Sequence, residues 1–275
     1  MIKPIIRRTV MEAKERWTNI HVGTSGYSYD DWRNVFYPAK LPKSEMLEFY
    51  TRHFKTVEIN ATYYAIPATA TFERLSEKSP VDFEFIIKTH QETTHRRKEN
   101  VAALAQLSAA VYPLVKTGKL KGFLAQFPYS FRNTEANRKY LIETRKLIDE
   151  HALFVEFRHA SWNHPAVSNF LSANEIGYVN VDEPSIEGLL PAQSLVTNNV
   201  GYIRFHGRNQ KTWWDGKGSQ RYDYYYPESE LQEWLIHISG ILKKAYKAYI
   251  FFNNHPGGKA VKNARQMIEL LKRSG

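Results

Sequence analysis

The 275-residue chain contains no cysteine. Disulfide bonds, thiolate nucleophiles and cysteine-bound metal sites are therefore excluded, and a cytoplasmic location is expected. No run of about 18 apolar residues occurs, so we expect neither a membrane-spanning helix nor a membrane partner. Residues 1–18 carry basic side chains without an apolar core, which is not the pattern of a secretory signal.

Acidic residues are the minority among the charged ones, since 28 Asp and Glu stand against 38 Lys and Arg and give a formal net charge of +10. A basic balance favours a small anionic ligand or a nucleic acid as partner, because a positive field steers anions towards the protein. A solvated basic surface is the alternative. With 43% hydrophobic residues the chain can fill one large core. We expect a basic N-terminal arm at 1–18 and a single domain at 19–275.

Apolar runs typical of buried strands alternate with segments of helical periodicity along this domain. Strands are predicted at 19–26, 56–62, 82–90, 119–127, 153–162, 177–182, 201–206 and 248–254. Helices are predicted at 42–54, 69–78, 100–115, 135–151, 164–173, 228–245 and 260–272. This alternation is typical of an α/β fold in which parallel strands are joined by crossover helices.

The count of strands matches the eight of a (β/α)8 TIM-type barrel, in which outer helices surround the strands and the site lies at the carboxyl ends of the strands. An open doubly wound sheet is the rival, but no GxGxxG turn follows the first predicted strand. Segment 184–199 lacks a clear helical pattern. The aromatic-rich segment 211–227 is the longest irregular stretch, and a loop of this length is expected to be functional.

The stretch LFVEFRHASW at 153–162 places charged residues within an apolar run. Because side chains alternate between the faces of a strand, Glu156 and Arg158 are expected to share one face. The same alternation predicts inward-facing polar residues near the carboxyl ends of the other strands: Glu58, Asn60, Lys88, His90, Gln126, Asn180, Asp182, Arg204, His206, and Asn254 or Asn253. Together they predict a pocket for a small polar or anionic ligand. A buried ion-pair network that only fills the barrel is the structural alternative.

General acid–base catalysis suits these residue types best. Glu58 or Glu156 is the expected base and His206 the acid or proton shuttle. Arg158 and Arg204 are expected to hold a carboxylate or phosphate group of the substrate, with Asn60, Gln126, Asp182 and Asn254 as further substrate-binding residues. Lys88 is a further catalytic candidate, since a lysine near other cations can form an imine with a carbonyl group.

No cofactor is predicted. A divalent metal is the alternative, because several side chains near the strand ends are of ligand type, namely Glu58, Glu156, Asp182, His206 and His255. The inward cations Lys88, Arg158 and Arg204 count against a metal, since they would repel it. The sequence also lacks the compact HxH and HExxH spacings of metal sites.

Gly257 and Gly258 precede the last predicted helix, so their N–H groups are expected to converge on an anion such as phosphate. An ordinary glycine turn is the alternative. Aromatic residues of the predicted upper loops are expected either to stack on sugars or bases or to pack the loops. They are Tyr27, Tyr29, Trp32, Tyr63, Tyr64, Trp162, Trp213 and Trp214, of which Tyr27 and Trp162 are the predicted substrate contacts.

Six runs follow one another in order over nearly the whole domain: GTSGYSYDDWRNVFYP at 23–38, VEINATYYAIP at 57–67, QFP at 126–128, VEFRHASW at 155–162, YIRFHGR at 202–208 and YIFFNNHPGGKAVKNA at 249–264. Together they resemble the YecE-like family, also called the domain of unknown function 72 proteins. The resemblance implies a TIM-barrel fold and no settled activity. The first motif of that family usually reads SGW, whereas Tyr27 stands here in place of the tryptophan.

Three functions compete. The first is an enzyme of hydrolase or lyase type that uses acid–base chemistry on a small substrate bearing phosphate, carboxylate or sugar hydroxyls. The second is a nucleic-acid-binding or nucleic-acid-processing protein, suggested by the basic balance, the aromatic loops and the run Arg96-Arg97-Lys98. The third is a ligand-binding barrel without catalysis.

Overall fold

The structure, a computed structural model, describes residues 17–148, 150–215 and 218–274, so the predicted arm lies almost entirely outside the described residues. The strands are β1 (Ile20–Thr24), β2 (Thr56–Ile59), β3 (Glu84–Lys88), β4 (Leu120–Gln126), β5 (Leu153–Glu156), β6 (Ile176–Tyr178), β7 (Asn180–Asp182), β8 (Val200–Phe205) and β9 (Lys247–Phe252). The α-helices are α2 (Met46–Thr51), α3 (Thr69–Glu77), α4 (Asn100–Lys116), α5 (Glu135–Lys146), α6 (Pro165–Ala173), α7 (Glu228–Leu242) and α8 (Lys259–Ser274). Among the described helices, none combines the length and apolar character that crossing a bilayer requires.

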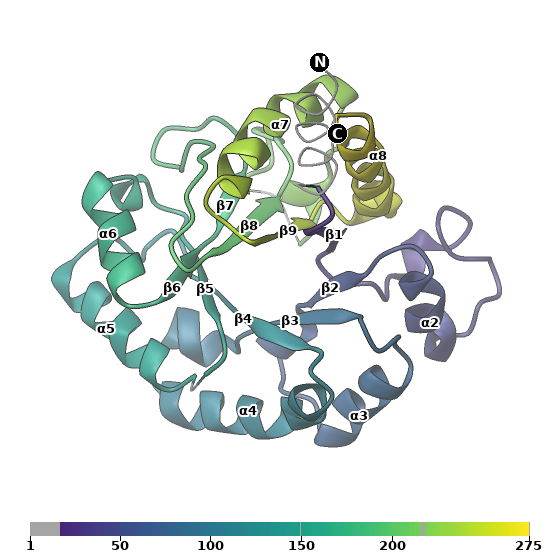
Figure 1. Ribbon diagram of the computed structural model, residues 1–275, viewed down its shortest axis with the longest axis horizontal. Coiled ribbons are helices and arrows are strands. Elements are labelled where there is room, and N and C mark those ends of the chain that lie inside the picture. The colour runs from purple at the N-terminus through teal and green to yellow at the C-terminus, as the bar shows by residue number, and fades with distance from the viewer. Residues whose placement is uncertain (1–16, 149, 216–217, 275) are drawn as a thin grey trace, which may run out of the picture.

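The strands form two parallel sheets, as expected for an α/β fold. One sheet has the order β1-β9-β8-β7 and the other β2-β3-β4-β5-β6. The strands lie in the middle of the molecule and the helices lie around them (Figure 1). Because every strand pair is parallel, the carboxyl ends within each sheet lie at one edge, and that edge carries the candidate site.

The described strands form two sheets and not one continuous eight-stranded sheet, so the parallel α/β fold is confirmed and the closed barrel stays a prediction. The predicted sixth strand is divided at Val179, so that β6 pairs with β5 while β7 pairs with β8. On the other side, β1 and β2 are joined by one isolated bridge between Ser25 and Glu58. The Gly26 N–H donates to the Glu58 carbonyl there, with an N···O distance of 2.7 Å. The two sheets therefore adjoin each other at these two places.

Local sequence explains where several helices begin. Thr134 caps α5, since its hydroxyl accepts a hydrogen bond from the Asn137 N–H. At α6, the His164 ring accepts from the Ala166 N–H and Pro165 occupies the first turn, where its missing N–H costs nothing. The chain between β7 and β8 has no helix, as segment 184–199 predicted.

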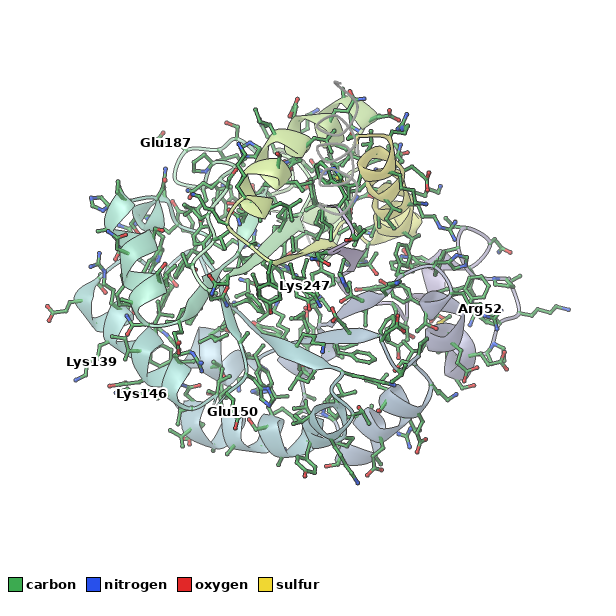
Figure 2. The ribbon with its side chains drawn as sticks, in the orientation of Figure 1. Arg52, Lys139, Lys146, Glu150, Glu187 and Lys247 are labelled. Atoms are coloured by element: carbon green, nitrogen blue, oxygen red, sulfur yellow. The ribbon has the colours of Figure 1, made fainter. Side chains whose placement is uncertain are left out.

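The core lies between the strands and the inner faces of the helices. Strand β3 shows the pattern, because Phe85, Ile86 and Ile87 are all buried, as expected for a parallel strand covered on both faces. Charged side chains lie on the outer faces of the helices, and Figure 2 shows Lys139 and Lys146 projecting from α5. The polar residues that enter the interior are therefore exceptions, and they gather at the strand ends.

Candidate functional site

Five charged side chains form a buried ion chain at the carboxyl ends of the strands: Glu58, Arg204, Glu156, Arg158 and Glu183. Arg204, from β8, lies between two carboxylates. It donates to Glu58 Oε1 and to Glu156 Oε2, both at 2.6 Å. The second oxygen of Glu58 accepts from the Tyr202 hydroxyl at 2.6 Å. Both carboxylates are 0% exposed, so Glu58 has no oxygen left to act as the predicted base.

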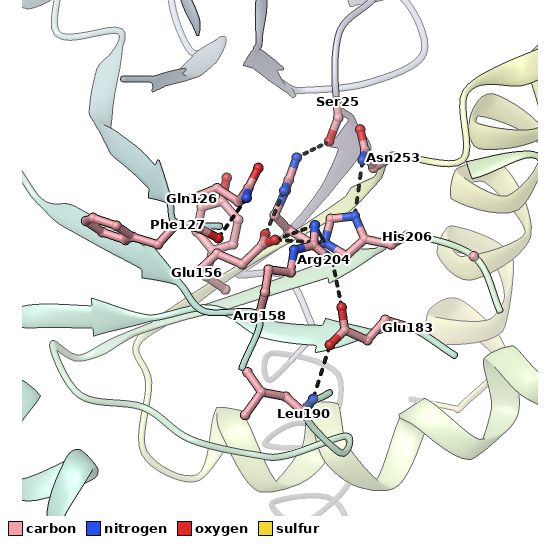
Figure 3. Close-up of polar contacts among 12 residues, drawn as sticks. Ser25, Gln126, Phe127, Glu156, Arg158, Glu183, Leu190, Arg204, His206 and Asn253 are labelled. Carbon is pink, nitrogen blue, oxygen red and sulfur yellow. Dashed lines mark hydrogen bonds and ion pairs between the residues drawn. The ribbon is translucent and has the colours of Figure 1, made fainter. Parts of the chain in front are cut away.

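Arg158 extends the ion chain from β5 to the end of β7. Its Nη2 lies 2.7 Å from Glu156 Oε1, and its Nη1 donates to Glu183 Oε2 at 2.6 Å. The Leu190 N–H then donates to the other oxygen of Glu183, with an N···O distance of 3.2 Å. Figure 3 shows this run of contacts from Arg204 through Glu156 and Arg158 to Glu183. Alternating charge offsets part of the desolvation cost of burying these ions.

The two carboxyl groups that Arg158 contacts, those of Glu156 and Glu183, differ in protonation. Although burial alone raises the pKa of Glu156, the charges of Arg158 and Arg204 hold that pKa well below its ordinary value. Burial raises the pKa of Glu183 to about 7, and Arg158 offsets this only in part. Glu156 is therefore ionised throughout the neutral range, whereas Glu183 exchanges a proton within it.

His206 supports the ion chain as a neutral ring. Burial, and then the charge of Arg158, lower its pKa to about 3. Its Nε2 lies 3.2 Å from Glu156 Oε1 and its Nδ1 lies 3.1 Å from the Asn253 side-chain nitrogen. The same Nε2 also lies 3.1 Å from Arg158 Nη2, so the ring contacts both members of the Glu156–Arg158 pair. The ring is 0% exposed, and its expected role as acid or proton shuttle stays a prediction.

A cavity of about 630 Å3 lies beside the ion chain, and we call it the cationic cavity. Its basic lining residues are Lys88, Arg158, Arg204 and Arg221. Its aromatic lining residues are Tyr29, Tyr63, Tyr64, Tyr129, Trp213, Trp214 and Tyr222. Among the described residues, no Asp or Glu lines it. The lining therefore favours an anionic ligand with a ring or other flat group.

Lys88, at the end of β3, extends its amine into this cavity. The amine donates to Gln126 Oε1 at 3.0 Å and lies 4.7 Å from the centre of the Tyr63 ring. Burial and the nearby charge of Arg204 lower the pKa of Lys88 to about 8. A larger share of this amine than of an exposed lysine is therefore neutral near pH 7 and available as a base or nucleophile.

Several predicted residues do meet in the cationic cavity. Asn60 and Gln126 line it together with Lys88, Arg158 and Arg204. The Asn60 side-chain oxygen is buried and has no hydrogen-bond partner among the described residues. Since a buried acceptor without a partner is costly, it is a natural contact for a donor on a ligand.

Asp182 does not point into the cationic cavity, which corrects its predicted orientation. Its carboxylate accepts from Tyr226 and Trp234, both at 2.6 Å, and pairs with Arg208 at 2.7 Å. Trp234 belongs to α7, so Asp182 faces the helices. The division of the strand at Val179 changes the alternation, and Glu183 is the inward carboxylate instead.

The paired asparagines after β9 also differ from expectation. The Asn254 amide donates to the Tyr224 carbonyl and to Asn263 Oδ1, both at 2.8 Å, so its side chain faces α8. Asn253 instead lines the cationic cavity and contacts His206. Asn253 therefore takes the place that was predicted for Asn254.

The glycine turn before α8 has no converging N–H groups for a ligand, which corrects the predicted anion site. The Gly257 N–H donates to Asp31 Oδ2 at 2.7 Å, and the Gly258 N–H donates to the His255 carbonyl at 3.2 Å. Gly257 has a φ of 62°, which glycine adopts without strain. A carboxylate of the chain itself therefore occupies the position expected for phosphate.

Tyr27 and Trp162 are packing residues, contrary to their predicted contact with substrate. Trp162 is 1% exposed and stacks on Phe157 with a centroid distance of 3.9 Å, while its indole N–H donates to the Phe131 carbonyl. Tyr27 packs against Tyr50 and is not part of the cationic cavity. The aromatic walls come instead from Tyr29 and the loops around Tyr63 and Trp213.

The candidate metal ligands do not fit a metal site. In the described ranges, no group of three or more His, Asp or Glu is placed to hold an ion. The oxygens of Glu58 and Glu156 face arginines and Tyr202, and Asp182 lies on the helix side. His255 lines the cationic cavity and stacks on Tyr29 with a centroid distance of 4.5 Å.

Sequence reasoning missed Glu183, His95, Arg221 and Tyr222. Glu183 was missed because the alternation was applied to one undivided strand at 177–182. His95 follows β3 in the turn η4 (Glu92–Arg96), which no pattern predicted. Arg221 and Tyr222 lie in the long segment 211–227, whose functional role was expected without named polar residues. The length of that loop was the feature of the sequence that could have indicated these two residues.

Comparison with known proteins identifies the family to which the chain belongs. Residues 21–275 match the family described as "Protein of unknown function DUF72", and the chain belongs to this family. The UPF0759 protein YunF of Bacillus subtilis (strain 168) is 31% identical over 269 residues, which cover 92% of this chain and 94% of that protein. The resemblance predicted from the motifs is thus confirmed.

Solved structures of the same family share the fold. A DUF72 family protein from Thermotoga maritima MSB8 is 37% identical, with a TM-score of 0.85 over 92% of this chain and 99% of that one. A DUF72 family protein from Enterococcus faecalis V583 is 26% identical, with a TM-score of 0.83 over 92% of this chain and 95% of that one. The architecture is therefore that of the family.

Proposed function

We propose that this protein is an enzyme, of hydrolase or lyase type, that binds a small anionic substrate in the cationic cavity and uses acid–base chemistry. The observation that carries this proposal is the cavity lining, in which four cations are present and the described residues contribute no carboxylate. The carboxylates of the site lie in the ion chain beneath, already paired. A substrate bearing phosphate or carboxylate supplies the missing negative charge.

Lys88 is the proposed base. Both Glu58 and Glu156 are held by Arg204, so neither carboxylate is available to a substrate proton. The Lys88 amine is bound only to Gln126 among the described residues and has a pKa near the working range of a base. Arg158 and Arg204 lie beside it but are paired with carboxylates of the ion chain, so Lys88 and Arg221 are the described lining cations left to stabilise negative charge on the substrate.

We also propose that the two sheets are halves of one (β/α)8 barrel. The bridge between Ser25 and Glu58 supports this on one side. On the other side, the Val179 N–H donates to the Val155 carbonyl at 3.0 Å, which continues the pairing of β6 with β5 to the residue just before β7. The cationic cavity then lies at the carboxyl mouth of the barrel, where such folds place their sites.

Anion-dependent stabilisation tests the binding step. Inorganic phosphate and small carboxylates are added at constant ionic strength, and the thermal unfolding temperature is measured against chloride. Wild type and Lys139→Met, which loses an exposed lysine of α5, are expected to rise equally. Lys88→Met is expected to lose most of the rise, because the unpaired cation is gone. Equal rises in all three proteins would contradict the proposal.

Catalysis is separated from binding by Lys88→Arg. Arginine keeps the positive charge but stays protonated, so it binds an anion and cannot act as a base. With phosphate- and carboxylate-bearing compounds as substrates, wild type is expected to turn over at least one of them and Lys88→Arg to bind it without turnover. Binding by wild type without any turnover would instead support the ligand-binding protein without catalysis.

A nucleic-acid function is the second candidate, and two exposed aromatic residues favour it. Tyr64 is 75% exposed and Trp214 is 47% exposed, and both line the cationic cavity. Exposed rings beside cations are typical of single-strand binding sites, where bases stack on them. Loss of single-strand binding in Tyr64→Ala and Trp214→Ala at physiological salt would support it.

A further inference from the structure

Lys88 is the unusual lysine of this fold. Lys247 pairs with Glu84 at 2.6 Å, and the buried amine of Lys119 donates to two carbonyls and one hydroxyl. Among the described residues, Lys88 has no carboxylate within ion-pair distance, and it is partly buried. Lys119 also has no carboxylate partner among them, but three oxygen atoms of the chain accept from its amine. The Lys88 amine has one hydrogen bond in the described part of the chain, to Gln126, and lines the cationic cavity, so its position points to a chemical role.

The carboxylate that could pair with Lys88 is already bound by arginines, so it does not neutralise the amine. Glu156, which is the nearest candidate on β5, is bound by Arg204 and Arg158. The remaining neighbours are the Gln126 side chain and the face of Tyr63. Burial first, and then the charge of Arg204, disfavour the ammonium form and lower the pKa of Lys88 to about 8.

We propose that the Lys88 amine forms an imine with a carbonyl compound that also bears a carboxylate or phosphate group. The neutral amine adds to the carbonyl carbon, and its proton moves to the oxygen to give a carbinolamine. Uptake of one proton from solvent then expels the hydroxyl group as water and leaves a protonated C=N bond. No oxidant or reductant is needed, since the nitrogen gains a bond to carbon and the oxygen leaves as water.

The substrate class follows from the cavity. This inference rests on the proposed function, because the anionic part of the carbonyl compound must find the cationic lining. Arg158 and Arg204 lie on the side of the ion chain, so the anion is held there while the carbonyl carbon meets Lys88. A protonated imine next to the reacting carbon draws electrons from it, which serves the bond cleavage of a lyase.

Reductive trapping tests the imine. The full chain is incubated with pyruvate or with pyridoxal phosphate, which carry a carboxylate and a phosphate respectively, and sodium borohydride is added. Mass spectrometry of peptides then locates the reduced adduct. Wild type and Lys139→Arg are expected to label at Lys88 at least tenfold faster than at any other lysine. Lys88→Arg is expected to lose this labelling while keeping the wild-type far-UV circular dichroism.

The outcomes separate the two proposals. Labelling spread evenly over surface lysines, or unchanged in Lys88→Arg, overturns the imine. If the imine is overturned in this way but phosphate stabilises wild type and not Lys88→Met, the anion site stands. Lys88 then acts there only as base and counter-ion. If phosphate stabilises neither protein and no adduct forms, both the proposed function and the imine are overturned.

Discussion

Two neighbouring carboxylates at the end of β7, Asp182 and Glu183, have different surroundings. Asp182 accepts from Tyr226 and Trp234 on the helix side, whereas Glu183 receives Arg158 from the ion chain. Burial is the first cause that raises the pKa of Glu183 to about 7. The ion chain thus ends in a group that changes its charge near neutral pH, and the net charge beside the cationic cavity changes with it.

Glu183 makes the stability of the fold depend on pH. Its folded pKa lies above its ordinary value, so the folded state binds the proton more tightly than the unfolded state does. This contribution is complete below the unfolded pKa and is lost as the pH rises through about 7. The free energy of unfolding of wild type is therefore expected to fall relative to Glu183→Gln, by on the order of 2 kcal/mol between about pH 5 and 8. Urea unfolding at each pH measures this difference.

Glu187→Gln is the matched control, because Glu187 is exposed on the same loop. Its unfolding free energy should follow that of wild type across the range. A constant difference between wild type and Glu183→Gln would show that Glu183 keeps one charge state throughout.

At the scale of elements, the junction of β1 and β2 depends on close backbone contact. Gly23 of β1 has no side chain where the Thr56 carbonyl approaches, and an added Cβ would lie 2.3 Å from that oxygen. The partner atom is backbone, so it cannot move aside as a side chain would. Glycine is therefore needed at position 23, because there is no space for a Cβ atom.

Gly23→Ala is accordingly expected to destabilise the fold by on the order of 2 kcal/mol or more, since the strands must separate. Gly240→Ala in α7 is the control, because the nearest atom to its Cβ is 3.4 Å away, in ordinary contact. Alanine is favoured in a helix, so this variant is expected to be neutral or slightly more stable. Guanidinium unfolding compares the two, and equal effects would show that the junction tolerates a methyl group.

The opposite ends of the strands contain a second charged group, around Glu84 at the start of β3. Its oxygens contact Lys247 at 2.6 Å, Tyr249 at 2.8 Å and His21 at 3.0 Å. Burial alone raises the pKa of Glu84, but hydrogen bonds from His21 and Lys247 outweigh it and lower that pKa to about 2. This group ties β3 to β1 and β9, the strands of the other sheet.

The Glu84 contribution is present above the unfolded pKa and is lost as the pH falls through about 2. Glu84→Gln is expected to cost about 3 kcal/mol at neutral pH. The cost should shrink by more than half as the pH falls towards 3, because the unfolded state then binds a proton at this carboxyl while the folded state still keeps the ion. Glu73→Gln, on the exposed face of α3, controls for removal of a surface charge. A cost independent of pH would assign the effect to packing.

For the whole molecule, the net charge of +10 predicts weak binding to any polyanion. Retention on a single-stranded DNA column is expected to vanish at moderate salt and to be unchanged in Lys88→Met, because one interior charge adds little to the outer field. Replacing the exposed Arg96 and Lys98 by serine should lower the eluting salt concentration. Retention at physiological salt that depends on Lys88 would favour the nucleic-acid function.

Prediction from sequence succeeded where a pattern is local. Apolar runs and helical periodicity placed the strands and most helices, because burial on both faces or on one face sets the pattern. Alternation placed Glu58, Glu156, Arg158 and Arg204 at one edge, and Lys88 and Gln126 with them. It failed at Asp182 and Asn254, where a divided strand and a turn changed which side chain faces inward.

The sequence by itself determined the elements, the family and the set of charges that enter the interior. Only the tertiary structure decided how those charges pair, because the partners lie far apart along the chain: Arg204 joins Glu58 to Glu156 across the strand ends. The pairing makes Glu58 and Glu156 unavailable, holds His206 neutral and leaves Lys88 without a counter-ion. Its physical reason is the low polarity of the interior, where each ion must find a partner at contact distance.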